Sequence, residues 1–164
     1  MHQYNTPFSD IVAFNEGNDF VSINDKAGPE LIPRKIHQVW LGGELPPIKK
    51  YIFEKTKRMY PSYQIKIWGE ADITPENFPL TYDIIKNMLR FNKCSPYNKL
   101  ASVSDIMRHE ILYNEGGIWK DANMEFFRPI LDKFLKYKLM VHKDVNGRFR
   151  FLQGMCFFAN MPKS

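Results

Sequence analysis

The chain has 164 residues, of which 44% are hydrophobic and 15% aromatic, enough to bury the core of about one domain and to exclude wholesale disorder. Lys and Arg total 23 against 18 Asp and Glu, and the resulting formal charge of +5 favours anionic partners in general. No apolar run approaches the length of a membrane span, so no transmembrane segment is expected. The two cysteines, Cys94 and Cys156, lack Cys-x-x-Cys spacing and are expected to be reduced thiols.

The sequence divides into a polar N-terminal stretch and a main part with regular apolar spacing. Residues 1–30 are expected to form an arm packed on the domain, and residues 31–164 to form the domain itself. The elements predicted from apolar spacing and from Gly and Pro positions are, in chain order, a strand at 36–41, a helix at 48–59, a strand at 63–68, a short helix starting at Thr74, helices at 82–89 and 100–112, an extended segment from 118, and strands at 139–142 and 155–159. Strands alternating with helices predict an α/β layer fold.

The most informative stretch is residues 116–123, with the sequence GGIWKDAN. Two glycines end a helical pattern, and an extended segment is predicted to follow. In an extended segment, residues two apart point to the same side, so Asp121 and Asn123 are expected to present oxygen ligands to one cation. Oxygen ligands suit magnesium or manganese, which bind through one or two carboxylates together with substrate phosphates. The spacing therefore points to a phosphate-bearing substrate.

Three segments are expected to bring polar or aromatic side chains to one edge of the sheet. Ligands of open α/β sheets bind at the carboxyl ends of the strands. Trp40 ends the first strand, and Trp119 and Asp121 end the strand after the glycines. The helix between them carries Asp105 and Arg108, three residues apart.

Three motifs in order resemble one known family. Residues 32–43 (IPRKIHQVWLGG), 101–108 (ASVSDIMR) and 112–119 (LYNEGGIW) are similar to motifs of the glycosyltransferases of the DXD sugar-binding group. This group, glycosyltransferase family 32 and its relatives, includes the clostridial glucosylating toxins and the fungal initiating α-1,6-mannosyltransferases. The resemblance covers about residues 31–162.

The resemblance implies a GT-A-like, Rossmann-type domain that binds a nucleotide sugar, with a mixed central sheet flanked by helices and a short C-terminal part. It implies a UDP- or GDP-sugar donor, a divalent cation (manganese or magnesium), and transfer with retention of the anomeric configuration. The acceptor implied is a glycan, a protein or a lipid. Without a membrane anchor, we expect a soluble protein in the cytoplasm or in a host-cell cytosol.

The resemblance also implies a donor-binding role for five residues, of which Asp121 belongs to the metal motif as well. Trp40 is expected to stack on the nucleotide base, and Asp105 to bind sugar hydroxyls with Arg108 beside it. Trp119 stands where the family commonly has Tyr, near the donor.

At the metal motif the sequence departs from the family. Asp121 matches the first acid, which contacts the metal and the ribose, whereas Asn123 replaces the second acid, the main metal ligand. An amide offers one neutral oxygen, so weaker metal binding is expected. Lys120, although it points away from Asp121 in a strand, is a candidate to replace part of the missing metal affinity. The substitution and the short C-terminal part leave open a second interpretation, a nucleotide-sugar-binding relative with weak or no catalysis.

Simpler structural interpretations stand beside these roles. Asp105 is alternatively the cap of a helix beginning at Val103, and Trp40 is alternatively a core residue. Asp-x-Asn triplets are also frequent in turns. The basic pair Lys49-Lys50 is expected to lie on a solvated helix face. A basic nucleic-acid-binding module is a distant alternative supported by charge alone, and no nucleic-acid partner is expected.

Overall fold

The computed structural model describes residues 29–91, 96–136, 139–140, 142–143, 149–150 and 155–158, with side chains described within 29–90 and 99–136. The predicted arm of residues 1–30 therefore lies almost entirely outside the described residues, as do Cys94 and the side chain of Cys156. Among the described residues, none of the helices has the length and apolar character needed to traverse a lipid bilayer.

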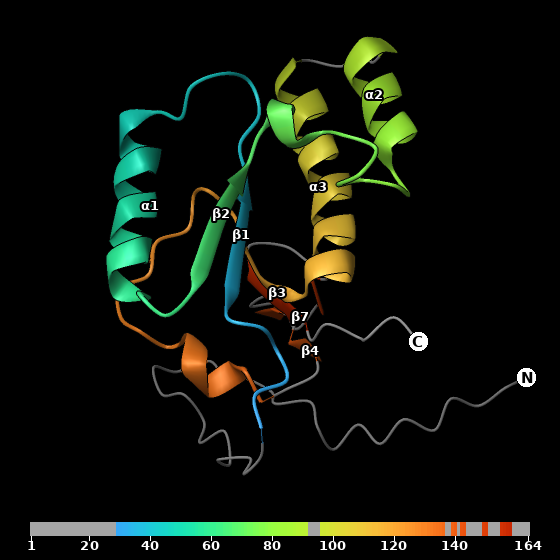
Figure 1. The fold of residues 1–164 in the computed structure, drawn as a ribbon. Helices are drawn as coiled ribbons and strands as arrows, with labels where there is room; N and C mark the ends of the chain where they lie inside the picture. The colour runs from blue at the N-terminus through green and yellow to red at the C-terminus, as the bar shows by residue number, and fades with distance from the viewer. Residues whose placement is uncertain are drawn as a thin grey trace, which may run out of the picture.

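A mixed sheet forms the centre of the fold (Figure 1). The strands are β1 Lys35–Val39, β2 Gln64–Trp68, β3 Gly117–Lys120, β4 Leu139–Met140, β5 His142–Lys143, β6 Phe149–Arg150 and β7 Met155–Phe158. Five of them lie in the order β2-β1-β3-β7-β4, with β5 and β6 paired separately. Strand β1 is parallel to β2 and β3, and β7 is antiparallel to β3 and β4. The predicted α/β class and mixed sheet are confirmed.

The helices lie where apolar periodicity predicted them. They are α1 Pro47–Met59, α2 Tyr82–Phe91 and α3 Pro96–Glu115. Helix α1 begins with Pro at its first position, where the missing N–H costs nothing, and it ends before Pro61. Helix α3 ends at Gly116, which has φ of 63°, the left-handed conformation that commonly ends helices.

The short helix predicted to start at Thr74 is wrong. This segment is a single turn in which the Phe78 N–H donates to the Thr74 carbonyl and the Asn77 N–H donates to the Thr74 hydroxyl. The next residue, Pro79, has no N–H to continue the pattern. A 3-10 turn at Glu70–Asp72 precedes it instead.

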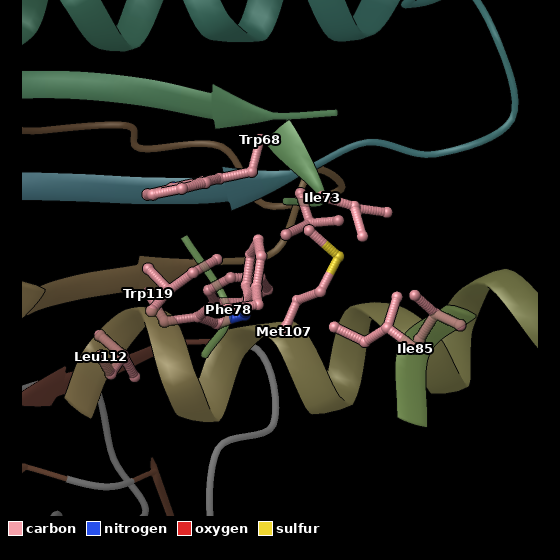
Figure 2. Close-up of a cluster of buried hydrophobic side chains, with 10 residues drawn as sticks. Trp68, Ile73, Phe78, Ile85, Met107, Leu112 and Trp119 are labelled. Atoms are coloured by element: carbon pink, nitrogen blue, oxygen red, sulfur yellow. The ribbon is translucent and has the colours of Figure 1, made fainter. Parts of the chain in front are cut away.

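Each face of the sheet packs on its own cluster of buried side chains. One cluster joins the sheet to α2 and α3, and its buried members are Val39, Trp68, Ile73, Phe78, Ile85, Val103, Met107, Ile111, Leu112 and Trp119 (Figure 2). The other consists of Ile32, Ile36, Tyr60, Tyr63, Ile118, Phe126, Leu131, Phe134 and Leu135. Because successive strand residues face opposite sides, Ile118 lies in the second cluster and Trp119 in the first.

The direction of the chain connections changes at the carboxyl ends of β1 and β3. From β1 the chain passes through α1 to β2 on one side, then returns through α2 and α3 to β3 on the other side. Helix α1 and the pair α2–α3 lie on opposite sides of the sheet (Figure 1). Such a change of direction is where ligands of open α/β sheets bind.

The His37 side chain connects β1 to the backbone just before β3 through a hydrogen bond. Its Nε2 lies 3.1 Å from the Gly116 carbonyl, and its Nδ1 accepts from the Trp68 indole N–H at 3.2 Å. An Nδ1 acceptor requires the neutral ring with its proton on Nε2, which then donates to Gly116. Burial, the largest cause, lowers the pKa of His37 from 6.5 to about 4.

This lowered pKa predicts an acid-sensitive fold. The neutral ring is favoured in the folded state, so its stabilisation is complete above pH 6.5 and is lost as the pH falls toward 4. Across that window His37 should contribute a loss of about 3 kcal/mol in the free energy of unfolding. Urea denaturation from pH 4 to 7, compared with His37→Gln, isolates this contribution from other titrating groups. Parallel stability curves for the two proteins would contradict the assignment.

Candidate functional site

Trp40 and Asp121 are the residues that follow β1 and β3, so both lie at the carboxyl edge of these parallel strands. Trp40 is half-buried and lies outside both buried clusters. Its backbone N–H donates to the Trp68 carbonyl at 2.9 Å, and its indole N–H donates to the Glu44 carbonyl at 3.3 Å. Trp40 is therefore not a core residue, and its partly exposed ring is compatible with stacking on a nucleotide base.

The loop after Trp40 is held close to its neighbours. The Gly42 N–H donates to the Glu70 carboxylate at 2.5 Å. Gly42 has φ of 98°, and a Cβ there would lie 2.9 Å from the Leu100 side chain. The positive φ accounts for glycine at this position, since the end of the flexible Leu100 side chain could move aside.

Asp105 and Arg108 form an ion pair one helical turn apart on α3. The side chain of Arg108 is only 11% exposed, whereas that of Asp105 is 59% exposed and accessible to a ligand. The Arg108 guanidinium lies 5.5 Å from the centre of the Trp119 ring, within the range of a cation–π contact. The cap interpretation of Asp105 is wrong because α3 begins at Pro96, so Asp105 lies inside the helix.

Trp119 links this ion pair to Asp121. Its ring is buried in the cluster shown in Figure 2, with 2% exposed, and its indole N–H donates to Asp121 Oδ1 at 2.7 Å. The structure thus joins Asp105, Arg108, Trp119 and Asp121 in one chain of contacts. Because its ring is buried, Trp119 acts on the site here by holding Asp121, and direct contact with a donor stays a prediction.

The extended arrangement predicted for Asp121 and Asn123 is wrong. Strand β3 ends at Lys120, and the Met124 N–H donates to the Asp121 carbonyl at 3.0 Å, which closes a turn over residues 121–124. Asp and Asn favour such turns, the simpler interpretation of this triplet. The same-side argument for the two oxygens therefore no longer applies.

Asn123 is instead connected to α1. The Lys49 ammonium donates a hydrogen bond to Asn123 Oδ1. Lys49 lies in the first turn of α1 and is partly exposed, and the adjacent Lys50 is exposed, so the predicted solvated face did not anticipate the contact of Lys49 with Asn123. Sequence reasoning missed Lys49 because nothing local distinguishes it from Lys50. The one available signal is that α1 follows the strand that leads to Trp40 and therefore begins near the carboxyl edge of the sheet.

Lys120 points to the opposite side of the sheet from Trp119. It is 0% exposed, and its ammonium lies 5.8 Å from the centre of the Phe126 ring. Within the described part of the chain, its Nζ has no hydrogen-bond partner. Burial lowers the pKa of Lys120 to about 8, and the positive charge of Lys49 acts in the same direction, against the opposing effect of Asp121 and Glu125.

The donor set at this turn does not fit a resident divalent cation. Asn123 Oδ1 already accepts from an ammonium group, and Asp121 supplies the single carboxylate of the motif. Two lysines, Lys49 and Lys120, are close enough for their charges to interact, and they repel a cation. No group of three or more His, Cys, Asp or Glu side chains able to hold a metal is found among the described residues. The predicted manganese or magnesium site stays a prediction.

Residues 10–150 match the family described as capsular polysaccharide synthesis protein. The chain belongs to this family. It is 27% identical over 125 residues to inositol phosphoceramide mannosyltransferase 2 of Schizosaccharomyces pombe, a match that covers 74% of this chain and 33% of that protein. This member of the capsular polysaccharide synthesis family therefore spans about a third of the length of the curated relative.

A solved structure supports the fold assignment. The family member described here resembles the PaToxG glycosyltransferase with a TM-score of 0.57 and 21% sequence identity, over 82% of this chain and 57% of that one. The resemblance to glycosyltransferases inferred from the three motifs is confirmed, and so is the fold class.

Proposed function

We propose that this protein is a glycosyltransferase that moves a sugar from a nucleotide-sugar donor to an acceptor hydroxyl. The observation that carries the proposal is the contact chain from Asp105 through Arg108 and Trp119 to Asp121, which ends at the carboxyl end of β3. Similarity to a mannosyltransferase and the fold of a glycosyltransferase support the same reaction class.

Each residue has a role that its surroundings permit. The half-buried ring of Trp40 is available to stack on the nucleotide base. The exposed carboxylate of Asp105 accepts hydrogen bonds from sugar hydroxyls, while Arg108 fixes its position through the ion pair. Asp121, oriented by the indole of Trp119, binds the ribose or the donor at the diphosphate end.

The reaction exchanges one bond for another at the anomeric carbon. The bond from that carbon to the β-phosphate oxygen breaks, and its electron pair stays on the departing nucleoside diphosphate. The acceptor hydroxyl oxygen forms the new bond, and its proton passes to the departing phosphate. Negative charge therefore develops on the diphosphate, and the site must stabilise it. Retention of the anomeric configuration, implied by the resemblance, is part of the proposal, and NMR of the product would test it.

Asp121→Asn is expected to lower kcat/KM by roughly 100-fold, because the amide keeps the shape of the side chain but loses its charge. The assay incubates the protein with a panel of UDP- and GDP-sugars and measures the nucleoside diphosphate released. Asp83→Asn, at an exposed position in the first turn of α2, is the matched control and should leave turnover within about twofold. Equal turnover by the Asp121 variant and the unmodified protein would remove Asp121 from the site.

A second candidate, a nucleotide-sugar-binding relative with weak or no catalysis, is favoured by Asn123. The amide already bonded to Lys49 replaces the second acid of the motif. Donor binding without turnover across the panel, and turnover restored by Asn123→Asp, would favour this candidate over the enzyme.

A further inference from the structure

We propose that Lys49 and Lys120 bind the donor diphosphate beside the Asp121–Asn123 turn. Their ammonium groups supply fixed positive charge, so nucleoside diphosphates bind there without a divalent cation. The inference rests on the proposed function, because it names how that same site holds its substrate.

The Lys49 ammonium is hydrogen-bonded to a group that carries no charge to offset its own. Its ammonium donates to the neutral amide oxygen of Asn123. An aspartate at that position would form a salt bridge and cancel the charge, whereas asparagine orients the ammonium and leaves its charge available. Asn123, the residue that departs from the motif, thus contributes no negative charge to offset that of Lys49.

Lys120 is a buried cation whose partner is missing from the described residues. It is 0% exposed, and no described group accepts a hydrogen bond from its Nζ. Lysine is almost never fully buried unless it is paired. Two acidic side chains, Glu125 and Asp121, act on its charge. The Glu125 carboxylate lies 2.5 Å from the Lys55 ammonium, and the Asp121 carboxylate accepts a hydrogen bond from the Trp119 indole. A bound phosphate oxygen is the kind of group that would complete its hydrogen bonding.

The N-terminal end of α1 adds positive potential near Lys49. Lys49 lies in its first turn, which contains no acidic residue, so the positive end of the helix dipole is not compensated there. The Lys49 ammonium contacts the turn at Asn123, and the charges of Lys49, Asp121 and Glu125 all act on Lys120. This balance favours a diphosphate over a divalent cation.

The test is calorimetric binding of UDP and GDP to the full chain, first in EDTA and then with manganese. Binding in EDTA is expected, with pyrophosphate competing. Lys49→Met should weaken it by roughly tenfold, since a charge-assisted contact to phosphate is lost. Lys50→Met, at the exposed neighbouring position, is the matched control and should leave affinity unchanged. Lys120→Met, with its fold verified by circular dichroism, should weaken binding in the same way.

A further variant reverses the proposed charge balance. Asn123→Asp should weaken nucleotide binding in EDTA, because Lys49 becomes salt-bridged, and should create manganese binding detectable by electron paramagnetic resonance. Nucleotide binding only with manganese, or equal affinity in the Lys49 and Lys50 variants, would overturn the inference and leave the proposed function standing. No nucleotide binding in either condition, together with no turnover, would overturn both.

Discussion

Replacing Gly117 with alanine is expected to lower the free energy of unfolding by about 3 kcal/mol, the sum of backbone strain and overpacking. Gly117 opens β3 with φ of 91°, a conformation that side-chain-bearing residues rarely adopt. A Cβ there would lie 2.8 Å from the Lys35 carbonyl oxygen and 3.2 Å from His37 Nε2. The neighbouring strand cannot yield without breaking the His37 contact to Gly116, so steric strain adds to backbone strain.

Gly43→Ala separates these two contributions. Gly43 has φ of 103°, but no atom lies within 4 Å of a Cβ built there, so only backbone strain of about 1 kcal/mol is expected. Urea denaturation of both variants measures the difference. Equal losses would mean that the crowding at Gly117 is relieved by small shifts. Because Gly117 begins the strand that carries Trp119 and leads to Asp121, its variant should also lose nucleotide binding.

Lys120→Met is expected to raise the free energy of unfolding by about 2 kcal/mol while weakening nucleotide binding. The ammonium of Lys120 is fully buried and has no hydrogen-bond partner among the described residues, so the folded protein bears an uncompensated desolvation cost. Methionine fills a similar volume without a charge, and it suits a position beside Phe126.

Thermal and urea denaturation measure the stability of the Lys120 variant, and calorimetry measures its nucleotide binding. Lys50→Met again serves as the control, because an exposed lysine should change stability by less than about 0.5 kcal/mol. A stability loss in Lys120→Met would mean that the ammonium has a partner that stabilises the fold. A gain in stability with a loss of binding is the pattern of a residue retained for its function.

Most of the fold follows from local patterns in the sequence. The strand predicted at 36–41 is observed as Lys35–Val39, and the helix predicted at 48–59 as Pro47–Met59. Both predictions rest on apolar spacing and on the positions of Gly and Pro, which act within a few residues. The segment at Thr74 was not predicted correctly, because its first turn looks helical and Pro79 ends it one turn later.

The elements that carry the candidate site residues were predictable from the sequence, whereas the geometry of those residues was less so. The position of Asp121 at a strand end followed from the glycines before it, whereas the turn that separates it from Asn123 depends on a backbone hydrogen bond to Met124. The contact of Lys49 with Asn123 joins residues 74 positions apart, and no local pattern indicates it. Burial of Arg108 against Trp119 depends likewise on how α3 packs on β3.

The indole of Trp119 has two roles. Its ring packs in the buried cluster on α3, and its N–H holds the Asp121 carboxylate at the end of β3. Thermostabilised variants of this protein therefore cannot be chosen on core volume alone. A substitution at Met107 or Leu112 that tilts the ring would displace the Asp121 carboxylate without touching it. Directed evolution for heat tolerance would then select against the proposed activity, unless the library keeps the residues that orient the Trp119 ring unchanged.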